Sequence, residues 1–181
     1  NFGGMEWINE KTILLNDSQT ISEYNVLNNT GKILKKAVSE SENLNYHSKS
    51  NQLAYTIANN IYVDEKAITK NIDKNIVSGQ SIARNEFGIS AGIFWSINGS
   101  YLAFYQKNEH NVHDYPLLDI NSTPGELVSI KYPMAGQSSE EPKIGIYSLK
   151  NHKTVYINPR GNKDDYFTNL CFTPDEKYIL V

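Results

Sequence analysis

The stretch Trp95-Ser96-Ile97-Asn98-Gly99-Ser100-Tyr101-Leu102-Ala103-Phe104 decides the fold, because its pattern recurs along the chain. Aromatic or apolar residues and a Ser or Thr precede a polar turn, and a short apolar strand follows it. The pattern returns at residues 46–55 and 172–181, with a weaker copy at residues 7–15. Each copy predicts a β-hairpin, since short polar turns between apolar runs are typical of hairpins.

The turn residues of the three clear copies are Asn51, Asn98-Gly99 and Pro174-Asp175, which we expect to supply the special backbone angles. A second hairpin arm follows each of the first three copies along the chain. Two hairpins per unit predict a four-stranded antiparallel blade. These second arms are residues 21–26, 60–63 and 143–149.

The spacing of the copies indicates a propeller. Corresponding apolar positions are Ile13, Leu53, Leu102 and Ile179, so successive copies lie 40, 49 and 77 residues apart. The first two spacings are typical of a propeller blade, and the third predicts a blade with an insertion. This inserted arm covers about residues 106–140, and its β-branched middle predicts an ordered segment.

We therefore predict an all-β fold in which residues 1–181 form a fragment of a β-propeller, with about three to four four-stranded blades. About three blades cannot close into a ring and hide their edge strands. The expectation is a piece of a larger propeller.

Composition limits the function classes. The net charge is -3 and the pI is about 5.8, so the basic surface expected of a nucleic-acid binder is missing. The single cysteine, Cys171, stands in an apolar run and is interpreted as a small buried hydrophobic residue. The chain has no long apolar run and its first residues carry no targeting pattern. Any export signal or anchor is expected outside this chain.

The sequence predicts no catalytic residue, metal site or cofactor within the chain. The nucleophile pattern Gly-x-Ser-x-Gly is absent, and no Gly-rich phosphate loop is present. The nearest pattern to a metal site is His110-Asn111-Val112-His113-Asp114, which we interpret as a solvated loop.

The segment from Val77 to Gly92 is the candidate functional loop. It joins one blade to the next and carries Arg84, Asn85 and Glu86. Loops that enter the inner strand of a propeller blade surround its central channel and can face a ligand. The residues alone leave two interpretations open: a ligand-binding loop, or a solvated connector with Phe87 packed in the core.

Residues 84–89, read together with residues 94–105, resemble the propeller of bacterial dipeptidyl peptidase IV, in the prolyl oligopeptidase family of serine peptidases. The likeness covers about residues 12–160. It includes the preceding blade and the insertion, at residues 52–55, 60–63, 114–117 and 132–136.

The resemblance implies an eight-bladed propeller that caps an α/β-hydrolase domain with a Ser-Asp-His triad. That hydrolase domain is absent from this chain, so the fragment alone is expected to be inactive. In the family, two acidic residues of the propeller bind the substrate's N-terminal ammonium, which fixes the release of Xaa-Pro or Xaa-Ala dipeptides. Glu86 corresponds to one of these acids, Asn85 stands where the other would be, and Arg84 adjoins them.

The resemblance also implies a homodimer, formed through residues 106–134 of the arm, and an exported bacterial protein in the periplasm or cell envelope. The expected partners are a peptide with a free N-terminus and the hydrolase domain of the same protein. Two alternatives stay open: a non-enzymatic propeller that binds partner proteins, and a related peptidase with tripeptidyl or endo-acting specificity.

Overall fold

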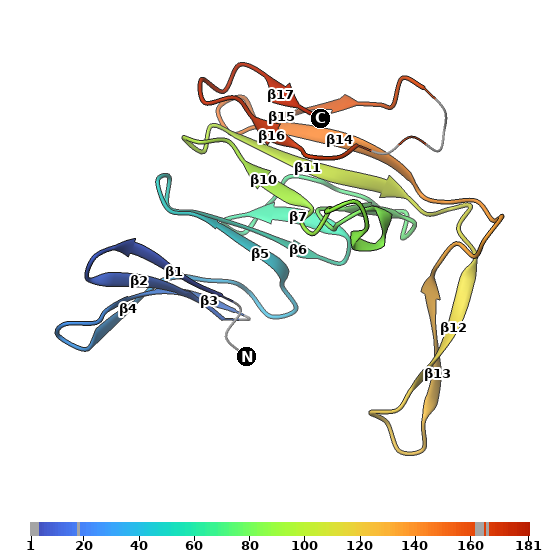
Figure 1. Cartoon of the computed structure of the whole chain (residues 1–181), viewed down its shortest axis with the longest axis horizontal. Coiled ribbons are helices and arrows are strands. Elements are labelled where there is room, and N and C mark those ends of the chain that lie inside the picture. Colours follow the sequence, from blue (N-terminus) through green and yellow to red (C-terminus); the bar gives the residue numbers. More distant parts are fainter. Residues whose placement is uncertain (1–3, 18, 162–164, 166) are drawn as a thin grey trace.

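The chain folds into consecutive antiparallel sheets. The computed structural model describes residues 4–17, 19–161, 165 and 167–181 (Figure 1). Among these residues the only helical element is the 3₁₀ helix η1 (Ala83–Asn85), so the predicted all-β class is confirmed. In Figure 1 the sheets succeed one another from the N-terminal to the C-terminal end, and one hairpin extends away from them.

The first two blades are four-stranded sheets in which each strand pairs with its neighbour in the chain. Their first hairpins, β1-β2 and β5-β6, are two of the four predicted copies of the repeat. The first blade consists of β1 (Gly4–Asn9), β2 (Thr12–Asn16), β3 (Thr20–Asn25) and β4 (Thr30–Lys36), and the second of β5 (Glu42–His47), β6 (Gln52–Ile57), β7 (Asn60–Val63) and β8 (Lys66–Ala67).

The third blade carries an insertion, which begins after Asn108 and not at residue 106, because residues 106–108 continue β11. Its strand order is β10-β11-β14-β15, and the arm hairpin β12-β13 lies between β11 and β14 in the chain. A further strand, β9, pairs with the end of β11. The bounds are β9 (Ile76–Ser78), β10 (Ile93–Trp95), β11 (Tyr101–Asn108), β12 (Asp114–Asp119), β13 (Glu126–Lys131), β14 (Glu141–Ser148) and β15 (Lys153–Ile157).

The last copy of the repeat forms the hairpin of β16 (Cys171–Phe172) and β17 (Ile179–Leu180). The expectation that Cys171 is buried is wrong, because its side chain is exposed. Successive residues of a strand face opposite sides, and here the neighbours Leu170 and Phe172 pack into the core.

The hairpin turns contain the expected backbone angles at two of three sites. Asn51 and Gly99 have φ of 53° and 73°, in the left-handed region. In the last copy the positive φ falls on Glu176, at 59°, and not on Pro174 or Asp175. The proline ring holds φ near -65°, so it cannot supply this angle.

Each hydrophobic core lies between two neighbouring blades, which is how propeller blades stack. One core joins the first and second blades through Ile21, Leu53 and Tyr55. The next joins the second and third blades through residues such as Ile61 and Phe104. A third core lies between the third blade and the final hairpin.

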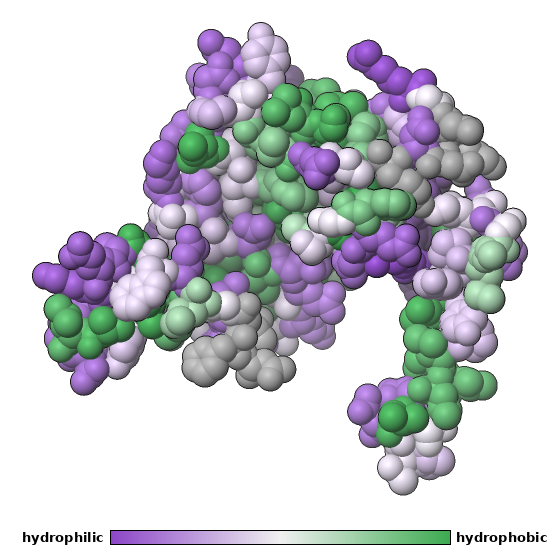
Figure 2. Space-filling model, viewed as in Figure 1, coloured by the Kyte–Doolittle hydropathy of each residue, from purple (hydrophilic) through white to green (hydrophobic). Residues whose placement is uncertain are grey.

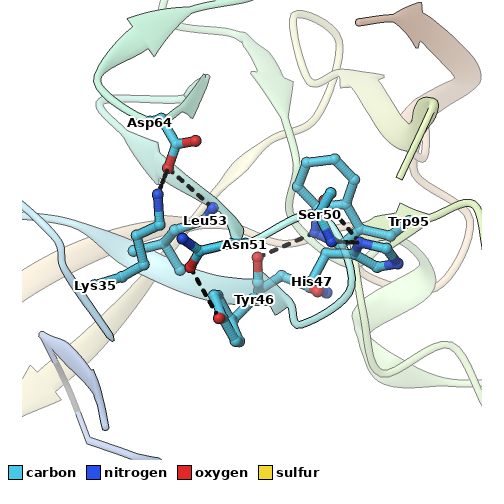
Figure 3. Close-up of polar contacts among 9 residues, drawn as sticks. Lys35, Tyr46, His47, Ser50, Asn51, Leu53, Asp64 and Trp95 are labelled. Carbon is cyan, nitrogen blue, oxygen red and sulfur yellow. Dashed lines mark hydrogen bonds and ion pairs between the residues drawn. The ribbon is translucent and has the colours of Figure 1, made fainter. Parts of the chain in front are cut away.

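Polar contacts connect the same blades (Figure 3). Lys35 of the first blade forms an ion pair of 2.9 Å with Asp64, which also accepts a hydrogen bond from the Leu53 backbone. His47 of the second blade packs against Trp95 of the third, with ring centroids 5.5 Å apart. The Trp95 indole nitrogen donates to the Asn45 carbonyl at 3.1 Å.

The turn of the third blade is tied to the last hairpin by Glu176. The Asn98 backbone N–H donates to Glu176 Oε1 at 2.6 Å. Burial acts to raise the pKa of Glu176, but hydrogen bonds from Ser96, Asn98 and Ser100 together lower it below its ordinary value of 4.5. The folded state therefore favours the ionised carboxylate.

We predict that Glu176→Gln destabilises the protein most at neutral pH. Because the folded pKa is lowered, the ionised carboxylate stabilises the fold above pH 4.5, and this contribution disappears as the pH falls through the folded pKa. Urea unfolding of both proteins between pH 3 and 7 measures the difference. If the difference in unfolding free energy between variant and parent does not become smaller in acid, the ionised Glu176 carboxylate is not the source of this stabilisation.

Candidate functional site

In the candidate segment Val77–Gly92, residues 77–78 belong to β9, and the loop that follows, residues 79–92, is closed at its base. Both ends of the loop form hydrogen bonds with the backbone of Tyr105 in β11. The Gly79 N–H donates to the Tyr105 carbonyl at 2.8 Å, and the Tyr105 N–H donates to the Gly92 carbonyl at 3.0 Å. A Cβ atom at Gly92 would collide with the Gln80 carbonyl group. Glycine is therefore required where the two ends of the loop meet.

Buried residues fix the loop on the core between the third blade and the final hairpin. Ile82 and Ile89 are buried beside Tyr105, and Ala83 joins the same cluster. The interpretation of the loop as a connector with Phe87 packed in the core is wrong in that contact, since the Phe87 side chain is 66% exposed. Because Ile82 and Ile89 already hold the loop on the core, the short turn between them projects outward.

That turn has an unusual backbone. Ala83, Arg84, Asn85 and Phe87 all have φ between 52° and 63°, a region that non-glycine residues rarely adopt. The Glu86 N–H donates to the Ala83 carbonyl at 2.8 Å, and the Ile89 N–H donates to the Glu86 carbonyl at 2.9 Å. Glu86 thus joins two consecutive hydrogen-bonded turns, residues 83–86 and 86–89.

The three predicted site residues lie side by side but differ in their surroundings. Glu86 and Asn85 are exposed, and no ion pair joins Glu86 to another residue of the described part of the chain. Arg84 is half-buried, and its guanidinium carbon lies 5.4 Å from the centre of the Tyr132 ring. Arg84 therefore contacts an aromatic face through a cation–π interaction and does not form an ion pair with Glu86.

A groove of about 240 Å³ opens beside this turn. The residues after the arm hairpin form its other wall, so the turn and the insertion meet here. Its lining residues are Ala83, Arg84, Glu86, Phe87, Tyr132, Pro133, Ser139 and Glu140.

A buried charged cluster lies behind the groove, and the sequence did not reveal it. The side chains of Lys107, Glu109 and Glu140 are all buried. The Lys107 Nζ lies 2.9 Å from Glu109 Oε1 and 3.5 Å from Glu140 Oε2. The Ala83 N–H donates to Glu140 Oε1 at 2.6 Å. No local pattern indicates this contact, because its partners lie 57 residues apart.

The described residues hold no group of three His, Cys, Asp or Glu side chains arranged to bind a metal ion. His110 and His113 are exposed in the segment after β11. Within the part of the chain that is described, no helix has the length and apolar character to cross a bilayer.

Comparison with curated proteins finds fungal relatives. Dipeptidyl aminopeptidase B of Saccharomyces cerevisiae is 30% identical over an alignment of 130 residues, which covers 64% of this chain and 16% of that protein. A protein described as a probable dipeptidyl-aminopeptidase B, from Talaromyces marneffei, is 24% identical over an alignment of 156 residues, which covers 73% of this chain and 17% of that protein. The chain thus spans about one sixth of the length of these relatives.

Comparison with solved structures finds bacterial relatives. A candidate dipeptidyl aminopeptidase IV from Bacteroides ovatus is 42% identical with a TM-score of 0.77, covering 96% of this chain and 25% of that one. Dipeptidyl peptidase 4 of Porphyromonas gingivalis, at 22% identity and a TM-score of 0.69, covers 96% of this chain and 26% of that one and shares the fold. The predicted propeller fragment is confirmed.

The sequence profile of the Dipeptidyl peptidase IV (DPP IV) N-terminal region matches residues 15–181. The blades, the arm and the loop that carries Glu86 all lie within or overlap this match. The chain belongs to the dipeptidyl peptidase IV N-terminal region family.

Proposed function

We propose that this chain is the part of a serine-type dipeptidyl peptidase that receives the free amino terminus of a peptide, with Glu86 as the anchor of its ammonium group. One observation carries the proposal: an exposed carboxylate without an ion-pair partner in the described residues stands at a groove, on a turn fixed by buried side chains. The names of the relatives supply the reaction class.

The chemistry of the turn suits a cationic ligand. An ammonium and a carboxylate form a charge-assisted hydrogen bond, which is about twice as strong as a neutral one. Asn85 contributes an amide dipole without a charge beside Glu86. Holding the amino terminus at a fixed distance from the catalytic serine of the hydrolase domain would select the second peptide bond for cleavage.

The test compares free and blocked amino termini. The full-length protein is assayed on Xaa-Pro and Xaa-Ala chromogenic substrates and on their N-acetylated forms. Cleavage of the free forms alone supports the proposal. Equal cleavage of both forms supports the endo-acting alternative, and peptide binding without any cleavage supports the non-enzymatic scaffold.

The same proposal includes a homodimer formed through the arm. Apolar side chains gather along the hairpin β12-β13, which extends away from the blades (Figures 1 and 2). Two cross-strand pairs, Tyr115 with Ile130 and Leu117 with Val128, lie on one face of this hairpin, and all four side chains are exposed. Exposed apolar faces of this kind are typical of interaction sites. The proposed location, an exported bacterial protein, rests on the family resemblance.

We predict that Leu117→Asp converts the dimer into a monomer. A charge in the centre of the apolar face would have to be desolvated without a partner when two arms associate. Light scattering after size-exclusion chromatography of the full-length protein measures the mass. Ile72→Asp is the control, because Ile72 is 99% exposed and lies outside the arm. If Leu117→Asp is still a dimer of unchanged stability, the dimer interface lies on another surface.

A further inference from the structure

We propose that Glu140 is a positioning residue for substrate recognition, because its buried carboxylate fixes the turn that presents Glu86. This inference rests on the proposed role of Glu86 as the ammonium anchor. Glu140 lies far from the turn in sequence and is brought to it by the return of the chain from the arm into β14.

The contact between Glu140 and the turn is direct. Glu140 is 2% exposed, and its Oε1 accepts the hydrogen bond from the Ala83 N–H. Ala83 is itself buried and begins the 3₁₀ helix that leads to Glu86. A buried backbone N–H without an acceptor is costly, so the Glu140 carboxylate satisfies a group that the turn cannot satisfy internally.

The backbone of the turn explains why such support is needed. Ala83 opens the run of left-handed residues that continues through Arg84 and Asn85 and resumes at Phe87. Conformations of this kind persist only when the surrounding structure determines them. Because Glu140 holds the first residue of the run, its removal is expected to release the turn and to disperse the position of the Glu86 carboxylate.

The charge of the cluster acts in the same direction. Lys107 is shared between Glu109 and Glu140, so two buried carboxylates face one buried ammonium. The formal charge of this set is negative, and Glu140 also lines the groove. The net negative charge of these three side chains behind the groove favours a cationic ligand in the groove. The two carboxylates also pair with Lys107, so this cation does not neutralise Glu86.

The experiment is a double-mutant cycle on the full-length enzyme, with a Xaa-Pro chromogenic substrate that has a free amino terminus. Glu140→Ala is expected to raise KM about 10-fold, near the lower bound for losing a hydrogen bond to a charged group, and to change kcat less than about 2-fold. Glu140→Gln should raise KM less, because its amide oxygen can still accept the Ala83 N–H. Glu141→Gln is the matched control, since this exposed neighbour should leave KM unchanged.

The cycle separates positioning from a general structural role. If Glu140 acts through Glu86, adding Glu140→Ala to Glu86→Gln leaves KM at the value of Glu86→Gln alone. Full additivity of the two changes, or an unchanged KM in Glu140→Ala, overturns the inference while leaving Glu86 as the anchor. A wild-type KM in Glu86→Gln removes the proposed function itself. If Glu140→Ala does not fold, the same cycle is run with Glu140→Asp, whose shorter side chain withdraws the carboxylate from the Ala83 N–H and keeps the negative charge beside Lys107.

Discussion

Replacing Phe104 with alanine is expected to lower the free energy of unfolding of the propeller by about 3–5 kcal/mol, the usual cost of removing a buried phenylalanine. Phe104 is 0% exposed in the core that joins the second and third blades. Its ring packs edge-on against Tyr156, with centroids 6.2 Å apart, and fills the space above Gly145. The neighbouring blades cannot collapse onto the vacated volume without giving up their own contacts.

The urea midpoint of the propeller transition in the full-length protein measures this change. Ile72→Ala serves as the control, since truncation of a side chain that is 99% exposed should change stability by less than about 0.5 kcal/mol. A loss below about 1 kcal/mol in Phe104→Ala would show that the core is not packed as described.

A second substitution tests the packing from the opposite strand. A Cβ atom at Gly145 would collide with the Phe104 ring, so Gly145→Ala alone should destabilise the protein. In the Phe104→Ala background the same methyl group enters the vacated space. The double variant is therefore expected to be more stable than the sum of the two single changes implies.

The blades could be predicted from the sequence because their cause is local and repeated. The copies at Trp95 and Tyr46 place apolar strands on both sides of a turn, and each turn needs particular backbone angles. Each of these features can be recognised in a stretch of about ten residues of sequence. The expectation for Pro174 and Asp175 was wrong because a proline can stand in a turn without taking its positive φ.

The candidate site could be predicted only in its exposed part. Glu86 belongs to a continuous segment that can be read as a motif, and the segment does form one turn. Glu140, which directly precedes β14, accepts a hydrogen bond from that turn, and Lys107 of β11 pairs with Glu140. Nothing in their local sequence marks either residue. Their positions depend on how the blade resumes after the arm, which is a property of the fold.

The fold also explains how a short turn can be both exposed and fixed. Ile82 and Ile89 lie in the same core as Ala103 and Tyr105 of β11. The turn is therefore stabilised by the packing of the third blade against the final hairpin. Substitutions in this core are expected to affect substrate recognition as well as stability.

Replacing Glu86 with glutamine in the full-length enzyme is expected to reduce kcat/KM on free-amino-terminus dipeptidyl substrates by about 10- to 150-fold, which corresponds to the loss of roughly 1.5–3 kcal/mol for a charged hydrogen bond. The amide keeps the shape of the side chain and removes the charge. Because Glu86 is exposed and makes no ion pair with other described residues, the thermal midpoint should not change.

Ionic strength adds a second readout. An exposed ion pair is screened by salt, so the KM of the parent enzyme should rise between 0.05 and 0.5 M NaCl, with a Debye length that shortens from roughly 14 to 4 Å, and that of Glu86→Gln should rise much less. Glu10→Gln is the matched control, because it removes one exposed charge from the turn between β1 and β2 and leaves both the groove and the arm intact. Parent-like kcat/KM and salt dependence in Glu86→Gln would remove this carboxylate from substrate recognition, since the substitution removes the negative charge and keeps the size of the side chain.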